Sequence, residues 1–345
     1  MRGVSARVRA AVFVAVLAVV VLGVGGFVLT QAATQEERFS APLAVPTTPL
    51  ADVADVPRLV FRHTGVDDHY GLVAVVPLDD PGGPRAFTDV ACDRVAASAG
   101  PTPVVSCLRA ERGLVPRFDQ VLLDPAWQET EQRPLRGIPS RTRLSPDGSL
   151  VSSTSFVSGH SYLQAGFSTV TEIHEVGGDS LGNLERFDLV VDGSTTTARD
   201  RNIWGVTFMD ADTFYATAAT GGRTYLVRGD LGARTLTAVR ENAECPSLSP
   251  GGGQVAYKVA GARGRPDSHW TIGVLDLATG TERLLTQQRT SVDDQVEWLD
   301  DDTLLYGLPR PDEAGVTDVW SSDVDPDAEP RLLVADAWSP TVVRA

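Results

Sequence analysis

A strand–turn–strand unit recurs about every 50 residues from residue 58 onward, and this repeat limits the fold more than any other feature of the sequence. Residues 144–148 (Leu-Ser-Pro-Asp-Gly) and 248–252 (Leu-Ser-Pro-Gly-Gly) are nearly the same turn, and each precedes a β-prone run. The Asp-rich turns 210–212 and 300–302 hold the same place in two further units. Ser, Pro, Asp and Gly favour tight turns, whereas the flanking residues favour strands.

A hairpin follows each of these units, and its first strand ends at or near an aspartate. The clearest copy has a strand at 274–277, a turn at 278–280 and a strand at 281–285. Similar hairpins are found at 75–88, 121–135, 226–237 and 319–333. Four strands per unit, repeated radially, form a β-propeller. We therefore expect an all-β fold, a six-bladed β-propeller, over residues 58–345.

The two ends of this stretch complement each other. Residues 341–343 resemble the first strand of a unit with no second strand after it, and residues 59–61 resemble a second strand with no first strand before it. Pairing of these N- and C-terminal strands would complete one blade and remove two exposed sheet edges. We expect the propeller to be closed in this way.

The turn at 144–148 and the aspartate-ended hairpins resemble those of the TolB-like six-bladed β-propellers. The resemblance covers about residues 58–345 and is clearest from Ile138 onward. The whole layout resembles membrane-anchored TolB-like proteins of actinobacteria. It implies an exported propeller that binds partner proteins or peptides, in some members at the mouth of the channel.

The N-terminal segment predicts an address. Residues 10–29 carry no charged side chain and, as a helix, would span ~30 Å, the thickness of a bilayer core. Arginines precede this run and Glu36 and Glu37 follow it, which places the N-terminus in the cytoplasm. The predicted parts are a cytoplasmic basic tip (1–9), a transmembrane signal-anchor helix (10–30), a Pro-containing extracytoplasmic spacer (31–57) and the propeller (58–345).

A cleaved signal peptide is the alternative interpretation of this segment. Signal peptides usually carry an apolar run of ~7–15 residues, and this run is longer, which favours a retained anchor. The protein would be a single-pass cell-membrane protein in the first case, and a secreted one if residues 1–33 are removed. In both cases the propeller is extracytoplasmic.

Composition narrows the partners. The chain has 30 Lys and Arg against 45 Asp and Glu, a net charge of −15, and such a body repels phosphate backbones. We therefore expect no nucleic acid. The expected partners of a monomeric chain are the lipid bilayer, through residues 10–30, and an envelope protein or peptide.

A candidate binding site follows from alignment of the inner strands on Trp298. The alignment brings an aromatic ring, an arginine and polar or acidic groups to the channel mouth: Arg141, Trp204, Glu244, Asp294 and Gln295. Together such groups could hold a ligand. Ordinary packing and hydrogen bonding between blades is the alternative interpretation. The leading functional hypothesis is a non-enzymatic protein- or peptide-binding or envelope-complex scaffold module.

Catalytic motifs are weak. Residues 178–182 (Gly-Asp-Ser-Leu-Gly) match two hydrolase patterns, but a hydrolase serine needs a strand-to-helix elbow, and a hairpin turn is expected here. The histidines have no metal-ligand spacing, so we expect no catalytic residue, metal or cofactor. The alternative for the cofactor is calcium, bound among the acidic residues at 293–302. The alternative for the function is a metal-dependent hydrolase or lactonase that uses channel carboxylates.

The three cysteines suggest one disulfide. Cys92 and Cys107 lie on neighbouring predicted strands with Gly100-Pro101 at the turn between them, and the exported compartment is oxidising. A loop of this length stabilises the fold by ~3 kcal/mol in the chain-entropy model. Cys245 is left over, and we expect it to be a buried thiol on an inner strand.

Overall fold

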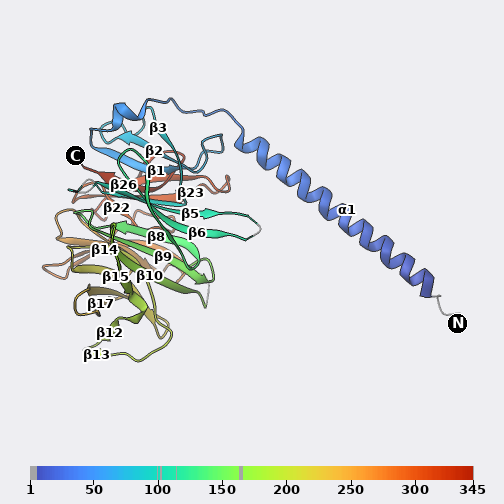
Figure 1. The fold of residues 1–345 in the computed structure, drawn as a ribbon. Helices are drawn as coiled ribbons and strands as arrows, with labels where there is room; N and C mark the ends of the chain where they lie inside the picture. Colours follow the sequence, from blue (N-terminus) through green and yellow to red (C-terminus); the bar gives the residue numbers. More distant parts are fainter. Residues whose placement is uncertain (1–5, 99, 102, 114, 163–165, 345) are drawn as a thin grey trace. The chain divides into compact units, whose positions relative to one another are not determined.

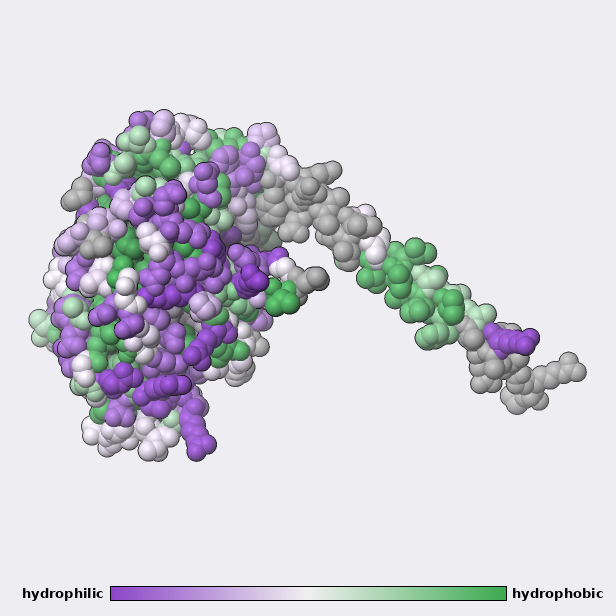
Figure 2. Space-filling model, viewed as in Figure 1, coloured by the Kyte–Doolittle hydropathy of each residue, from purple (hydrophilic) through white to green (hydrophobic). Residues whose placement is uncertain are grey.

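A computed structural model describes residues 6–98, 100–101, 103–113, 115–162 and 166–344. The chain divides into two compact units, residues 1–44 with 66–70, and residues 45–65 with 71–345. The first unit contains helix α1 (Ala6–Phe39) (Figure 1). Its exposed apolar side chains between Val12 and Phe27 form the green band in Figure 2. Within the described residues, no helix is long and apolar enough to cross a membrane, so the anchor stays a prediction.

The structure contains two helical segments in residues 31–57, where the sequence predicts a spacer without regular structure. Helix α1 continues to Phe39, because the segment contains no proline and the residues after the apolar run, mostly Ala, Gln, Glu and Arg, are good helix formers. Further on, η1 (Leu50–Val53) belongs to the propeller unit, and Val53 packs in a core cluster with Val60 and Val75. The chain was expected to be extended here because no amphipathic period marks either segment.

Six sheets, antiparallel except for one parallel pair of strands in blade 4, confirm the six-bladed all-β propeller. From the inner to the outer strand, blade 1 consists of β26 (Ala337–Val343), β1 (Arg58–His63), β2 (Leu72–Pro77) and β3 (Ala86–Ala91). Blade 2 consists of β4 (Arg94–Ser98), β5 (Val104–Glu111), β6 (Arg117–Leu123) and β7 (Glu129–Pro134). Blade 3 consists of β8 (Ile138–Leu144), β9 (Leu150–Ser158), β10 (Ser168–Glu175) and β11 (Ser180–Asn183). Blade 4 consists of β14 (Asn202–Phe208), β15 (Thr213–Thr220), β16 (Arg223–Asp230) and β17 (Thr235–Glu241), with two further strands described below. Blade 5 consists of β18 (Glu244–Leu248), β19 (Gln254–Ala260), β20 (Trp270–Asp276) and β21 (Glu282–Leu284). Blade 6 consists of β22 (Glu297–Trp298), β23 (Thr303–Pro309), β24 (Thr317–Asp323) and β25 (Arg331–Val334).

The repeated Ser-Pro turns fold alike in blades 3 and 5. Gly148 donates its N–H to the Ser145 carbonyl at 2.9 Å, and Gly252 does the same to Ser249 at 2.9 Å. Both glycines have positive φ, 76° and 71°, which a side chain would strain. The hydroxyl of Ser145 also accepts the N–H of Leu150, the first residue of β9, at 2.8 Å. The turn residues therefore start the second strand of each blade.

Blade 1 combines the two ends of the propeller unit. Strand β26 pairs antiparallel with β1, with Leu59 opposite Val342 and Val60 opposite Thr341. The red β26 lies beside the blue β1 in Figure 1. Inner strands also contact one another around the axis, from β26 through β4, β8, β14, β18 and β22 back to β26.

Blade 4 carries two strands that the repeat pattern did not predict. After β11 the chain passes through η2 (Leu184–Arg186) to β12 (Asp188–Val191) and β13 (Ser194–Thr195). Strand β12 pairs in parallel with β17, and β13 pairs with β12, so blade 4 has six strands. Leu184, Phe187 and Leu189 are buried in the core between blades 3 and 4. Their burial explains why the chain passes from blade 3 to the outer edge of blade 4 before it forms β14.

The cysteine prediction is confirmed. Cys92 and Cys107 form a disulfide with a Cα–Cα distance of 5.4 Å. Cys107 lies on β5 as expected, and Cys92 lies just before β4 rather than in it. Cys245 is a buried free thiol on β18.

Candidate functional site: the two ends of the central channel

The six inner strands line a channel whose two ends differ. Side chains near the start of these strands form what we call the charged end: Arg94, Arg141, Glu244, Lys258, Asp293 and Asp294. Residues near their C-terminal ends, with the turns that follow, form the open end. Both ends lie within the propeller unit.

Lys258 is the centre of the charged end. It lies on β19 opposite Glu244 and is completely buried. Its Nζ lies 2.8 Å from an Asp293 carboxylate oxygen and 3.9 Å from Glu244 Oε2. It also lies 3.8 Å from the centre of the Trp270 ring, a cation–π contact. A buried ammonium needs such partners, because burial alone favours its neutral form.

Two of the five predicted site residues join blades. Asp294 accepts from Arg94 Nη1 at 3.2 Å and from the Gly307 N–H at 3.1 Å. Gln295 donates from Nε2 to the carbonyls of Val206 (3.0 Å) and Pro246 (2.8 Å). Both side chains are buried, and their polar atoms are used to join blades 2, 4, 5 and 6.

Two of the other three predicted residues, Arg141 and Trp204, contact a tyrosine that the sequence did not single out. Tyr162, in the loop after β9, stacks on Trp204 with ring centres 5.0 Å apart. Its hydroxyl lies 2.6 Å from the Ser140 hydroxyl, and Arg141 packs 5.4 Å above its ring. Glu244 accepts from Trp270 Nε1 at 3.2 Å. Side chains therefore pack closely at the charged end, where Arg141, Trp204, Glu244 and Lys258 are buried and Asp293 stays 44% exposed.

The pKa directions agree with this geometry. Burial raises the pKa of Glu244, although Lys258 opposes the shift. Burial would also raise the pKa of Asp293, but Lys258 and Arg141 lower it below its ordinary value. Burial and the like charge of Arg141 lower the pKa of Arg94 to about 10. The neighbouring cations therefore favour the ionised form of Asp293, whereas burial outweighs Lys258 at Glu244.

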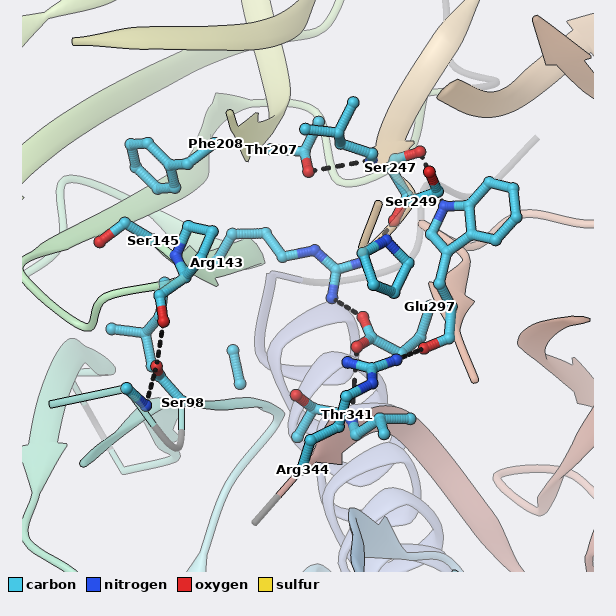
Figure 3. Close-up of a pocket in the computed structure, with 18 of the residues that line it drawn as sticks. Ser98, Arg143, Ser145, Thr207, Phe208, Ser247, Ser249, Glu297, Thr341 and Arg344 are labelled. Carbon is cyan, nitrogen blue, oxygen red and sulfur yellow. Dashed lines mark hydrogen bonds and ion pairs between the residues drawn. The ribbon is translucent and has the colours of Figure 1, made fainter. Parts of the chain in front are cut away.

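The open end is a cavity of about 560 Å³, shown in Figure 3. All six blades contribute to its lining, mostly through short polar side chains and turns: Ser98, Ser145, Thr207, Ser247, Ser249 and Thr341. The Ser-Pro turns of blades 3 and 5 form part of its rim, with Pro146 and Pro250 exposed. The sequence alignment placed the candidate site at the opposite end of the same strands. The signal for this cavity was the repeated Ser-Pro turn, which was used only to count blades.

Two arginines approach this cavity in different ways (Figure 3). Arg143 on β8 forms an ion pair with Glu297 and donates to the Val296 carbonyl. Arg344 is exposed and donates from Nη2 to the carbonyls of Trp298 (2.7 Å) and Leu299 (3.0 Å). It makes no ion pair with any residue that the structure describes, so its charge is available to a ligand.

The hydrolase-like motif lies in a hairpin turn, as expected. Gly178 and Asp179 lie in the turn between β10 and β11, Ser180 is the first residue of β11, and its hydroxyl accepts the Gly182 N–H at 3.1 Å. The serine begins strand β11 and does not lead directly into a helix, so this described segment is not a strand-to-helix elbow.

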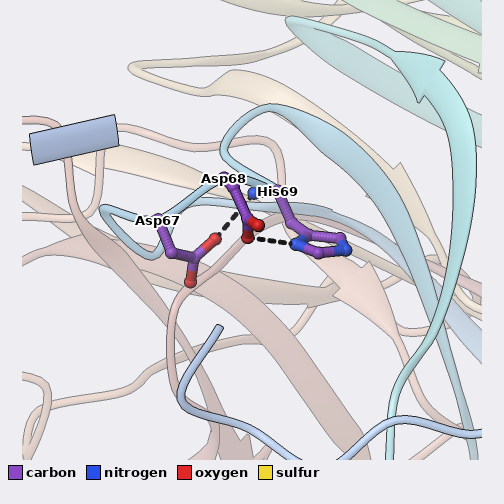
Figure 4. A group of neighbouring side chains, drawn as sticks. All are labelled: Asp67, Asp68 and His69. Atoms are coloured by element: carbon purple, nitrogen blue, oxygen red, sulfur yellow. Dashed lines mark hydrogen bonds and ion pairs between the residues drawn. The ribbon is translucent and has the colours of Figure 1, made fainter. Parts of the chain in front are cut away.

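Asp67, Asp68 and His69 form a group that the search for histidine spacing missed (Figure 4). Their potential ligand atoms lie within 4.8 Å of one another in the first unit. His69 Nδ1 lies 2.6 Å from Asp68 Oδ1, and the His69 N–H donates to Asp67 Oδ1 at 2.9 Å. These contacts within the group account for its geometry without an ion.

Comparison with known proteins shows solved structures with a similar fold. No family model and no curated protein matches the chain. TolB from Acinetobacter baumannii is similar, with 15% identity and a TM-score of 0.57 over 84% of this chain and 67% of that chain. A nidogen/laminin complex structure gives 12% identity and a TM-score of 0.53 over 83% and 98%. A putative TolB from Agrobacterium tumefaciens gives 10% and 0.47 over 80% and 87%.

The six sheets and their channel define the class of the protein, a six-bladed β-propeller. Within that class its fold is TolB-like, as the resemblance of the turns predicted. At these identities the likeness shows the fold alone. The resemblance to membrane-anchored actinobacterial proteins stays a prediction.

Proposed function

We propose that this protein is a non-enzymatic, extracytoplasmic β-propeller module that binds a protein or peptide segment at the open end of its channel. The observation that carries the proposal is the cavity of about 560 Å³ to which all six blades contribute. Ligand sites commonly have volumes of about 300–1,000 Å³. Hydroxyl groups, turn backbone and the exposed guanidinium of Arg344 supply donors suited to an extended peptide.

The charged end supports this choice over the metal-dependent hydrolase or lactonase. A metal site needs carboxylates free to bind the ion. Here Asp293 pairs with Lys258, Asp294 with Arg94, and Glu297 with Arg143. Metal analysis of the dialysed protein separates the two functions, because stoichiometric calcium or zinc would favour the enzyme.

The binding proposal is tested with a photocrosslinking amino acid at Pro250, on the rim of the open end, in the full chain in its native membranes. The matched control carries the same amino acid at Leu332, which is 51% exposed on the outer strand of blade 6. We expect one discrete adduct from position 250 and none from position 332. Equal adducts from both positions, or none from position 250, would contradict binding at this end.

We also propose that residues 10–29 hold the propeller outside the cytoplasmic membrane. The support is the uncharged run and its flanking arginines in the sequence, whereas no described helix qualifies as a span by its structure. Carbonate-washed membranes should keep the full-length chain, and external protease should release the propeller. Recovery of the protein in the medium, beginning near residue 33, would instead identify a cleaved signal peptide.

A further inference from the structure

A small chamber lies in the channel between its two ends, with a volume of about 20 Å³. Three arginines line it, Arg94 from β4 and Arg141 and Arg143 from β8. Asp294 is the only acidic residue among its lining residues that the structure describes. A chamber of this size holds about one water-sized particle. We call it the arginine chamber.

Two of the three arginines have close carboxylate partners. Arg94 Nη1 lies 3.2 Å from Asp294 Oδ1, and Arg143 forms an ion pair with Glu297, which does not line the chamber. Asp294 also accepts the N–H of Gln295 at 2.9 Å and that of Gly307 at 3.1 Å. Its negative charge is thus shared among three donors.

Arg141 is the exception. Its guanidinium comes no closer than 3.9 Å to a carboxylate of the described residues, that of Asp293, and the Asp293 side chain is 44% exposed. Its hydrogen bonds go to carbonyls, those of Ser140 (3.0 Å) and Asp293 (3.5 Å). Its Nε–H is buried and has no partner among the residues described, although the side chain is only 7% exposed.

This arrangement has an excess of positive charge in a buried place. Burying a guanidinium without a close counter-charge costs several kcal/mol, and an unpaired buried donor adds to the cost. Burial, and then the like charge of Arg141, lower the pKa of Arg94, whereas nearby groups, Asp294 and Asp293 among them, raise the pKa of Arg141 against the effect of burial. A water molecule would satisfy the Arg141 Nε–H, but it would not neutralise the charge.

We propose that the arginine chamber binds one small monovalent anion of chloride size. The anion accepts the Arg141 Nε–H and lies among the three guanidinium groups, with the Asp294 carboxylate as its one repulsive neighbour. It neutralises the arginine that the protein leaves without a close carboxylate. The proposal does not depend on what binds at the open end.

The test uses the full chain, solubilised in detergent, and chloride itself as the probe. Melting temperatures are measured in sodium chloride and in sodium gluconate at equal ionic strength, and binding is followed by the excess ³⁵Cl line width. Because a ligand that binds only the folded state stabilises it, chloride should raise the melting temperature and broaden the ³⁵Cl line. Bromide should compete the broadening away.

Two substitutions locate the effect. Arg141→Gln removes the unneutralised charge and should abolish both chloride effects. Arg141→Lys keeps the charge but lacks the Nε–H, and should bind chloride about tenfold more weakly, the loss expected for one charge-assisted hydrogen bond. Arg223→Gln, at an exposed pair with Glu241 on blade 4, is the charge-matched control and should leave both effects unchanged.

The wild-type measurements alone can overturn the proposal, even if a variant fails to fold. Equal melting temperatures in chloride and gluconate, with no excess ³⁵Cl broadening, would show that water fills the chamber. Broadening that persists in a folded Arg141→Gln variant would place any chloride elsewhere.

Discussion

The two ends of the channel are built on the same inner strands, yet their surfaces have opposite characters. At the charged end, long side chains of opposite sign lie within 4 Å of one another under the Tyr162–Trp204 stack. At the open end, serines, threonines and turn residues surround a cavity of about 560 Å³. Long side chains fill the space that the blades enclose, whereas short ones leave it open.

This contrast assigns different roles to the two ends. Removing a side chain from the charged end should cost stability, because its neighbours are left unpaired or a cavity forms. Removing one from the open end should cost little stability and should affect binding instead. The following experiments test that division, in order of decreasing effect on the free energy of unfolding.

Removal of residues 338–345 should break both ends at once. Strand β26 contributes Trp338, which packs 4.5 Å from the Arg94 guanidinium at the charged end, and Thr341 and Val342, which line the open end. Losing the inner strand of blade 1 removes the buried Val342 and Val343 and exposes the edge of β1, so we expect a loss of about 5 kcal/mol or more.

The measurement is a thermal and urea melt of the truncated and the intact chain. A chain that ends at Val343 is the matched control, because it keeps all of β26, and it should melt close to the intact chain. If the 338–345 truncation melts at the same temperature as the intact chain, β26 is dispensable and the description of blade 1 is wrong.

Trp204→Ala tests packing at the charged end alone. Trp204 is fully buried and stacks on Tyr162, so its removal should lower the free energy of unfolding by about 3–5 kcal/mol. Trp204→Phe is the control. Because the indole Nε1 has no partner among the described residues, phenylalanine loses no hydrogen bond and should cost much less. Urea unfolding gives both values, and similar costs for the two variants would contradict a packing role.

Glu244→Gln tests the charges of the charged end and should change the free energy of unfolding less. Since burial raises the pKa of Glu244, its ionised form is less favoured in the folded than in the unfolded state. Its contribution to stability is therefore complete below its ordinary pKa of about 4.5 and is lost as the pH rises through the raised value. Relative to the variant, the wild type should become less stable as the pH rises above about 4.5.

Asp293→Asn should show the opposite sign. The pKa of Asp293 is lowered by Lys258 and Arg141 against the effect of burial, so its contribution is present above the ordinary value of about 3.8. It should be lost as the pH falls through the lowered value. Urea unfolding of both variants and the wild type between pH 3 and 8, about the range of these shifts, measures the differences. Parallel curves for all three proteins would contradict the assignment.

Arg344→Gln should have the smallest effect on stability. The side chain is exposed and makes no ion pair within the described part of the chain, so we expect a change within about 0.5 kcal/mol. The adduct from the crosslinker at position 250 should nevertheless decrease, because the free guanidinium of the open end is lost. A large loss of stability with an unchanged adduct would reverse the roles of the two ends.

The blades could be predicted from the sequence because their signals are local. The turn at Ser145–Gly148 needs a hydroxyl, a proline and a glycine at fixed positions, and each does its part within a few residues. The Cys92–Cys107 pair likewise needed only two neighbouring strands. Register within one hairpin is set by its own turn.

The surroundings of the site could not be predicted, because they depend on contacts between distant segments. Tyr162 lies in a loop without a strand or helix pattern, and its position over Trp204 depends on the fold of two blades. Lys258 is the single lysine of the chain, and its partner Asp293 lies 35 residues away, in the connection to the next blade. The alignment found residues that lie together, but it could not show that they already bind one another.

Strands β12 and β13 were missed for a similar reason. A hairpin of blade 3 was expected to continue through residues 184–189, and the burial of Leu184 and Phe187 against blade 4 decides otherwise. Parallel pairing of β12 with a strand almost 50 residues later, Asp188 opposite Thr235, leaves no local mark in the sequence.

That parallel pairing also sets an order of assembly. Synthesis makes β12 before β14–β17, yet its hydrogen-bonding partner is β17, the last of them. A growing chain that has just released β12 and β13 can pair these two strands with each other, but β12 lacks its partner β17 until four more strands have emerged and folded. Stalling anywhere between Asn202 and Thr235 leaves Leu189 without the core that buries it, which makes this interval the one in which a holding chaperone would protect the nascent chain most.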